Sequence, residues 1–223
     1  MQVIQRKLIR SLIAILFVSF VPAVAAADTV EVLNVNPGAF INMTYIFKGA
    51  SRTSEAGQIN ILWNGANTWS YCVDLDHSAT SGRTYDATSI IPLPAQYLNV
   101  AWLLENFQAD VFKGLTNTDR NKRAAGLQSA IWETLYDHSY MLTSTDQAIV
   151  YWQDWYLGHL PPIGSFTGAG YILLDLNNPV GFTCPYENQD LITKDPTTAP
   201  EPLTILLLGM GLAGLAGLRR KEE

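Results

Sequence analysis

Cysteine, histidine and positive charge are all scarce in this chain of 223 residues. It has two cysteines and three histidines, His77, His138 and His159, and no HExxH or CxxC spacing links them into a metal site. Repeats of fixed period, blocks of like charge and glycine-rich phosphate loops are also absent. The sequence therefore predicts neither a metal site nor another cofactor.

Basic residues are few in the central part of the chain. Between Asp28 and Pro200 there are 8 Lys and Arg against 17 Asp and Glu, which gives a net charge of −9. This balance argues against binding to nucleic acid or to a membrane surface through a basic patch, and it favours solubility. The segment is long enough for one domain with a hydrophobic core.

The N-terminus has the pattern of a secretory signal peptide. Positive charges at 6–10 precede an apolar run over 12–21, and Ala25-Ala26-Ala27 supplies small residues for a cleavage site. We expect residues 1–27 to be removed, so that the exported protein begins at Asp28.

The C-terminus combines three parts in a fixed order. Pro200, Glu201 and Pro202 precede an apolar run over 203–218, and Arg219 and Arg220 follow it. An upright membrane helix needs about 20 apolar residues, so this run is slightly short, and the basic residues after it would stay in the cytoplasm. An ordinary C-terminal anchor is one interpretation of this pattern.

The three parts together resemble the PEP-CTERM sorting tail of Gram-negative bacteria, which an exosortase recognises. The resemblance implies an exported protein that is held transiently in the inner membrane by a C-terminal transmembrane helix. After processing, such a protein reaches the cell surface or the extracellular matrix. We therefore expect a sorting segment over 200–223, a Pro/Thr linker over 194–199 and one ectodomain over 28–193.

Within the ectodomain, the apolar pattern changes from a strand period to a helical period and back. It predicts strands over 29–35, 40–47, 58–63, 68–75, 170–176 and 182–184, and helices over 94–107, 119–136 and 144–156. Asn64-Gly65 predicts a hairpin turn, and Asp119 predicts a helix N-cap. The predicted fold class is α+β, with an antiparallel β-sheet or small sandwich and a helical insertion packed on it.

Gln128 occupies an unusual position for a side-chain amide. On the predicted helix it shares a face with Ile131, Trp132 and Leu135. A buried amide without a partner costs about 1–3 kcal/mol. Gln128 therefore needs a hydrogen-bond partner from elsewhere in the domain.

Cys72 is also placed unlike an ordinary core residue. Strand alternation puts it on the face opposite Tyr71 and Val73, whereas a merely structural cysteine is expected among the apolar side chains. Asp74 and Asp76 share its face, and we expect these two carboxylates to be solvated. The pattern predicts a thiol that is either covered by a helix or reactive.

The segments Tyr71-Cys72-Val73-Asp74 and Leu127-Gln128-Ser129-Ala130-Ile131-Trp132-Glu133 resemble the paired signatures of thioester domains in bacterial surface proteins. In that family, a cysteine on a strand and a glutamine at or near the start of a helix form an internal thioester. The two segments have the family's order here, and the pattern departs at Leu127, where the best-known members have Thr.

The resemblance implies a Cys72–Gln128 thioester that captures an amine-bearing surface or matrix molecule, for adhesion or matrix cross-linking. Cys suits this chemistry because its thiolate is a strong nucleophile and a good leaving group. Tyr71, Ile131 and Trp132 would keep water out, and Asp74 is close enough in sequence to tune the thiol. Such a domain acts once and is not a turnover enzyme.

Two other interpretations of Cys72 stay open. An oxidising compartment favours a disulfide with Cys184, and this would give a non-covalent matrix or carbohydrate-binding protein. The aromatic residues Trp152, Trp155 and Tyr156 would be its candidate sugar-stacking face, although core packing is the role that we expect for them. A secreted hydrolase using Cys72 and His77 is the third interpretation.

Overall fold

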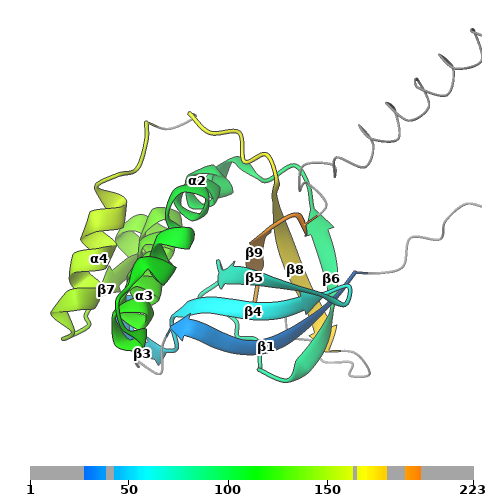
Figure 1. Cartoon of the computed structure of the whole chain (residues 1–223), viewed down its shortest axis with the longest axis horizontal. Coiled ribbons are helices and arrows are strands. Elements are labelled where there is room, and N and C mark those ends of the chain that lie inside the picture. Colours follow the sequence, from blue (N-terminus) through cyan, green and yellow to red (C-terminus); the bar gives the residue numbers. More distant parts are fainter. Residues whose placement is uncertain (1–27, 39–42, 163–164, 180–188, 197–223) are drawn as a thin grey trace, which may run out of the picture.

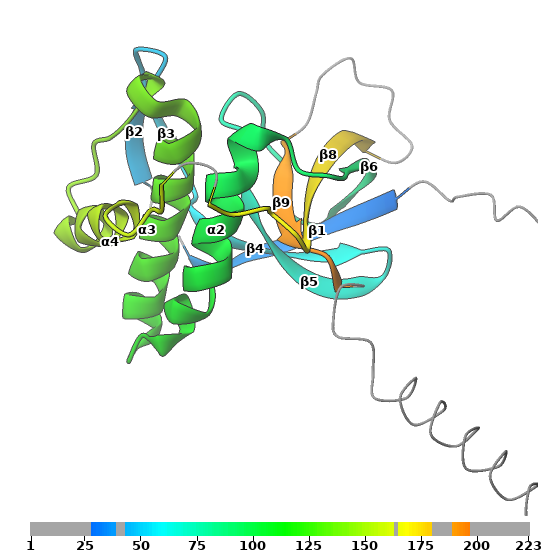
Figure 2. The same cartoon turned by 90° about the horizontal axis from the view of Figure 1, so that it is seen from above.

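The computed structural model describes residues 28–38, 43–162, 165–179 and 189–196. They form a closed antiparallel β-barrel and, beside it, a group of three α-helices with a small second sheet (Figures 1 and 2). The expected signal peptide, the strand expected over 182–184 and the sorting segment lie outside the described residues. Within the described ranges, no helix is long and apolar enough to span a membrane.

The barrel contains six strands, and the last one in sequence lies beside the strand that carries Cys72. Their order is β1 (Asp28–Gly38), β4 (Gly57–Trp63), β5 (Ala66–Cys72), β9 (Leu191–Lys194), β8 (Tyr171–Pro179) and β6 (Arg83–Ile90), which closes on β1. All neighbouring strands are antiparallel. In the register of β5 with β9, Cys72 pairs with Leu191. The residues just before β9 are therefore brought to the end of β5.

The hairpin between β4 and β5 has the turn that its sequence predicts. Asn64 and Gly65 have φ of 50° and 80°, and Trp63 pairs with Ala66 across them. Two consecutive residues with positive φ are typical of the type I′ turn, which suits the twist of a two-stranded hairpin. This tight connection fixes the register that places Cys72 at the end of β5.

The helices are inserted between β6 and β8. They are α2 (Leu98–Phe107), α3 (Asn117–Tyr136) and α4 (Gln147–Leu157), with short 3₁₀ turns at Ala95–Tyr97, Ala109–Lys113 and Asp137–Ser139. A three-stranded sheet of β3 (Ala50–Ser54), β2 (Met43–Phe47) and β7 (Tyr140–Leu142) accompanies them. The predicted helical insertion is thus present, and the mixed architecture with antiparallel strands agrees with the expected fold class.

Helix α3 is the element that joins the insertion to the barrel. Its N-cap is Thr116, whose side chain accepts a hydrogen bond from the N–H of Asp119 at 3.1 Å, so Asp119 is not the cap that the sequence predicts. Nine consecutive residues, Ala124 to Trp132, are buried. A helix buried all round in this stretch must be covered on several sides, and α3 packs against α4, β1 and β4.

The sheet differs from the prediction in two ways. It closes into a barrel, whereas the sequence predicts an open sheet or a small sandwich. Four strands were also not predicted, namely β3, β6, β7 and β9. All residues of β3 are exposed or half-buried, and β6 is largely polar. Strands β7 and β9 have only three and four residues, so none of the four carries the alternating apolar signal on which the prediction relied.

The environment of Cys72 also corrects an expectation. Cys72 is 3% exposed and belongs to the hydrophobic core, and its neighbours Tyr71 and Val73 are buried as well. Both faces of this end of β5 are therefore covered, and the expected separation of Cys72 from the apolar residues is wrong. Helix α3 lies over this end of β5.

Candidate functional site

The side chain of Gln128 on α3 is paired with the backbone of Cys72 on β5. Its Oε1 accepts a hydrogen bond from the Cys72 N–H at 3.1 Å, and its Nε2 donates to the Cys72 carbonyl at 2.7 Å. Gln128 is 1% exposed, so these two bonds satisfy an amide that is removed from water. The expected partner of Gln128 is therefore the peptide backbone of Cys72, and we call this pairing the glutamine clamp.

The sulfur of Cys72 contacts a different glutamine. The Nε2 of Gln189 lies 2.6 Å from Sγ, and Sγ donates to the backbone carbonyl of Asp74 at 2.8 Å. The first contact is short even for an N–H···O hydrogen bond, although sulfur is the larger atom. Since an amide C–N bond is about 1.3 Å long, the carboxamide carbon of Gln189 lies within about 3.9 Å of Sγ.

Sequence analysis missed Gln189. No motif or period marks it, and only the pairing of β9 with β5 brings it to the thiol. The N–H of Val73 donates to the carbonyl of Asp190 at 3.0 Å, which extends this pairing by one residue and places Gln189 beside Sγ. The structure therefore brings both glutamines to Cys72, with Gln128 on its backbone and Gln189 on its side chain.

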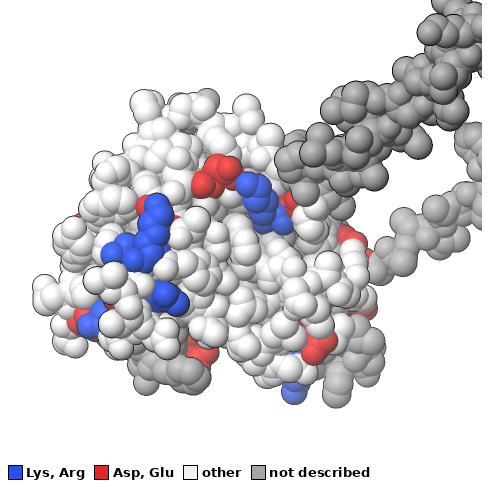
Figure 3. Space-filling model, viewed as in Figure 1, with Lys and Arg blue, Asp and Glu red and all other residues white. Residues whose placement is uncertain are grey.

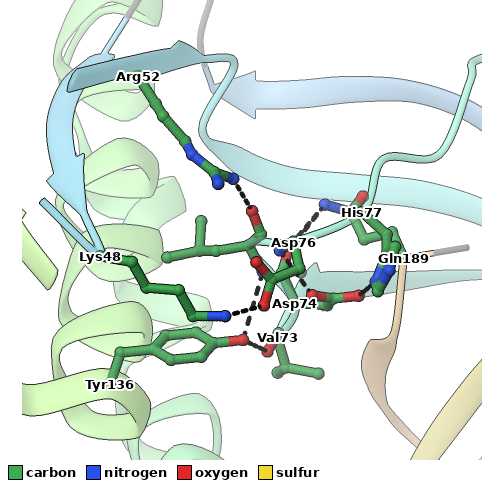
Figure 4. A network of polar contacts seen from close by, with 10 residues as sticks. Lys48, Arg52, Val73, Asp74, Asp76, His77, Tyr136 and Gln189 are labelled. Atoms are coloured by element: carbon green, nitrogen blue, oxygen red, sulfur yellow. Dashed lines mark hydrogen bonds and ion pairs between the residues drawn. The ribbon is translucent and has the colours of Figure 1, made fainter. Parts of the chain in front are cut away.

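The loop that follows β5 is held in place by residues from two other elements (Figure 4). The hydroxyl of Tyr136, at the end of α3, donates to the carbonyl of Val73 at 3.0 Å and accepts from the N–H of Leu75 at 3.3 Å. Arg52 of β3 donates to the carbonyl of Leu75 at 2.6 Å. These bonds fix the backbone on which Asp74 presents its carbonyl to the thiol.

The acidic side chains of this loop have partners. The expectation that Asp74 is solvated is wrong, whereas Asp76 is exposed. Asp74 Oδ2 lies 2.5 Å from Nδ1 of His77, and Asp74 Oδ1 accepts from the N–H of Asp76 at 2.8 Å. Asp76 in turn pairs with Lys48 at 2.6 Å. Among the described residues, no group of three His, Cys, Asp or Glu side chains could hold a metal ion.

Burial controls the protonation of Cys72. It raises the pKa of the thiol from an ordinary value of 9.0 to about 12, while hydrogen bonding to the backbone of Asp74 and the nearby indole of Trp132 act in the opposite direction. At neutral pH, Cys72 is therefore a protonated thiol. A hydrolase with a standing thiolate needs the reverse shift, so this environment disfavours the Cys-hydrolase interpretation.

The expected supporting residues are buried in the core. Tyr71 and Ile131 are completely buried, and Trp132 is 2% exposed. The hydroxyl of Tyr71 and the indole N–H of Trp132 are buried, and neither has a hydrogen-bond partner with standard geometry in the described part of the chain. Such a dry environment slows hydrolysis of an activated acyl group.

Two cavities reach the site. The smaller, of about 230 Å³, is lined by Cys72, Gln128 and Gln189 together with parts of β1 and β4. The larger, of about 660 Å³, is lined by Trp132, Asp74 and His77, and Gln189 also belongs to its wall. Gln189 thus lies between the buried thiol and an open cleft, and we call the larger cavity the access cleft.

The other candidate residues form packing contacts or lie outside the description. Trp152 and Trp155 are half-buried: Trp152 packs under the guanidinium of Arg123 at 4.0 Å, and the ring of Trp155 is 5.1 Å from that of Phe107. These contacts favour the core-packing interpretation of the aromatic residues on α4. Cys72 is a free thiol, and Cys184 lies outside the described residues.

Surface charge is sparse on the face seen in Figure 3. Lys and Arg side chains form small groups there, and acidic side chains lie close to some of them. This distribution follows from the low content of charged residues, which make up 15% of the chain.

Comparison with known proteins identifies the C-terminal tail. Residues 198–221 match the PEP-CTERM protein-sorting motif, and this confirms the resemblance seen in the sequence. The motif implies recognition by an exosortase-type enzyme, with export, passage through the membrane and processing for display at the cell surface. The match does not include the barrel or the helices. No curated protein and no solved structure matches the chain.

Proposed function

We propose that this exported protein captures primary amines covalently through an internal thioester between Cys72 and Gln189. The observation that carries the proposal is the contact of 2.6 Å between the Gln189 carboxamide and Sγ of Cys72. The pairing changes the one implied by the sequence resemblance, in which Gln128 is the acyl donor. Gln128 uses both of its polar groups on the Cys72 backbone, so we assign it the role of a clamp.

Thioester formation is balanced by the groups already in contact. Sγ attacks the carboxamide carbon of Gln189, a C–S bond forms, and the carbonyl oxygen becomes negative in a tetrahedral intermediate. When this intermediate collapses, the C–N bond breaks and the nitrogen takes up the thiol proton and leaves as ammonia. Reactions are accelerated strongly when the two reacting atoms are held about 3–3.5 Å apart in the right orientation. The contact between Gln189 and Sγ supports such an approach of the carboxamide carbon.

In the capture of an amine, the sulfur is the leaving group and no longer the nucleophile. A neutral primary amine attacks the acyl carbon of residue 189, the C–S bond breaks, and the sulfur takes up the proton that the nitrogen loses. The product is an amide that joins the amine to residue 189 and restores the Cys72 thiol. A lysine side chain on a surface or matrix molecule has the required chemistry and can approach through the access cleft, which Gln189 lines.

The sorting tail gives this chemistry its setting. A protein displayed outside the inner membrane meets foreign or matrix amines, and one permanent bond per molecule suffices for adhesion or matrix cross-linking. The domain would therefore act as a single-turnover covalent anchor, without a cofactor. The burial that raises the pKa of the Cys72 thiol also keeps water away from the acyl group.

Peptide mass spectrometry of the full chain, purified after export, tests the proposal. The peptides that contain Cys72 and residue 189 should be joined, with one ammonia less than the sum of their masses. Treatment with methylamine should separate them and leave a methylamide on Gln189. Gln189→Ala should abolish both signals, and so should Cys72→Ala.

The same experiment separates the competing assignments. A methylamide on Gln128, lost in Gln128→Ala and kept in Gln189→Ala, would replace our assignment with the one implied by the sequence. A Cys72–Cys184 disulfide, with full ammonia content at both glutamines, would overturn amine capture altogether.

A further inference from the structure

The indole N–H of Trp132 is a buried donor near the thiol of Cys72. Trp132 is 2% exposed, and its Nε1 has no hydrogen-bond partner with standard geometry in the described structure. Leaving a buried donor unpaired is unfavourable, and a phenyl ring would fill much of the same space without that disadvantage. The indole N–H of Trp63, on strand β4, is also buried without such a partner. A missing partner alone therefore does not indicate a role, and what distinguishes Trp132 is its position beside Cys72.

The glutamine clamp determines where this donor lies. Trp132 follows Gln128 by one helical turn, so the two side chains are neighbours on the same face of α3. Because Gln128 is bonded to the Cys72 backbone, the indole is carried to the cysteine as well. Tyr45 and Tyr140 pack against it, with ring centroids 5.5 and 5.9 Å away, which holds the indole in place.

Trp132 also borders the place where the proposed reaction develops charge. It lines the access cleft together with Gln189 and Asp74. Its effect on the thiol shows the same proximity, since the indole side chain favours the negative form of Cys72 and lowers the pKa of its thiol against the stronger effect of burial. A fixed, dry donor at such a point can stabilise an anion that exists only during the reaction.

We propose that the indole N–H of Trp132 donates a hydrogen bond to the acyl oxygen of residue 189 when that oxygen becomes negative. This inference rests on the proposed Cys72–Gln189 thioester and assigns a further catalytic residue to it. In thioester formation, the negative oxygen appears as the C–S bond forms and disappears as ammonia leaves. In amine capture, it appears as the C–N bond forms and disappears as the C–S bond breaks.

The test is the rate of methylamine incorporation at residue 189 in the full chain, compared between Trp132→Phe and wild type. The variant keeps an aromatic ring and loses the N–H. We expect a decrease on the order of 100-fold in the maximal rate at saturating methylamine, which is the typical effect of removing one such donor. The methylamine concentration at half-maximal rate should change little, because the donor acts on the transition state and not on the bound amine.

Trp63→Phe is the matched control, since it also removes a buried, unpaired indole N–H from the barrel. It should capture methylamine at about the wild-type rate. If Trp132→Phe does not fold, as judged by thermal unfolding, replacement of Trp132 by benzothienylalanine keeps the shape of the indole with sulfur in place of N–H and should show the same loss of rate. A folded variant at position 132 that reacts as fast as wild type would overturn the inference. Wild-type protein with no ammonia loss at Gln189 would instead overturn the proposed function on which it rests.

Discussion

At the scale of single residues, the site depends on two identical side chains with different partners. Gln128 is bonded through both amide groups to the Cys72 backbone, while Gln189 contacts the sulfur. The difference arises from their elements: Gln128 projects from a helix that packs across the end of β5, and Gln189 precedes a strand that pairs with it. A glutamine side chain can pair with a peptide backbone through its amide, or it can supply an acyl group to a nucleophile. The groups around each glutamine determine which of these it can do.

The protonation of Cys72 gives a prediction at the same scale. We use Gln189→Ala, in which Cys72 must remain a thiol. Its pKa is about 12 when folded and near 9.0 when unfolded, so between these values the native state binds more protons than the unfolded state. The contribution of Cys72 to stability is then complete below pH 9 and is lost as the pH rises, with a decrease of about 1.4 kcal/mol by pH 10.

Urea unfolding of Gln189→Ala between pH 7 and 10 measures this decrease. The control carries Cys72→Ala in addition, so that the buried tyrosines, whose pKa values burial also raises, contribute equally to both proteins. Parallel curves for the two variants would mean that the thiol titrates at its ordinary pKa in the folded protein, and that it is not isolated from water as the fold indicates.

At the scale of elements, helix α3 organises the site. Its N-terminus is capped by Thr116, its middle lies against α4, and its second half presents Gln128 and Trp132 to the barrel. The close approach of α3 to α4 depends on Gly126. A Cβ built at this position would lie 2.5 Å from Cβ of Trp152 and 3.1 Å from the backbone nitrogen of Gln153. Only the absence of a side chain allows the two helices this separation.

We predict that Gly126→Ala destabilises the protein although alanine is the better helix former. The gain in helix propensity is about 1 kcal/mol, whereas overpacking against the backbone of α4 costs about 1–3 kcal/mol. Chemical denaturation should therefore show a net loss of about 1 kcal/mol or more. Thr118→Ala, at an exposed position of the same helix, serves as the control and should change stability by less than about 0.5 kcal/mol. Equal or higher stability of Gly126→Ala would show that α4 can move away without loss.

At the scale of the whole molecule, the strand that carries Cys72 and the strand that leads to the sorting tail are direct neighbours. Strand β9 pairs with β5 and ends at Lys194, and the PEP-CTERM motif begins at residue 198. In the proposed reaction, an amine bound at residue 189 would be attached only a few residues before the sorting motif in the sequence. This connection is short and does not pass through the helical insertion.

The sorting motif gives a prediction for the intact protein. Replacement of Pro200, Glu201 and Pro202 by alanine removes the recognition element and leaves the apolar run of the tail in place. The variant should accumulate as an unprocessed form in the inner membrane, which cell fractionation and immunoblotting detect. Thr197→Ala, just before the motif, is the control and should be processed normally. Surface display of the triple variant at the wild-type level would show that the tripeptide is not required for sorting.

Much of this protein follows from local sequence patterns. The helices, the Asn64-Gly65 turn and the need of Gln128 for a partner depend on periodicity, backbone conformation and the unfavourable burial of an unpaired amide, which act within a few residues. The sorting tail is likewise a contiguous motif, so it was recognised from the sequence and confirmed by comparison. Strands β3, β6, β7 and β9 were missed because their own residues carry little apolar alternation.

Tertiary structure alone decided the burial of Cys72 and the identity of its neighbour. Closure of the barrel covers both faces of β5, and a strand of four residues brings Gln189 to a sulfur 117 positions earlier in the chain. The sequence around Cys72 predicts neither its burial nor its contact with Gln189, because both depend on which strand pairs with β5. The sequence by itself determined the sorting motif and singled out Cys72 and Gln128, because both depend on contiguous residues. The packing of β9 and α3 decided which glutamine meets the thiol.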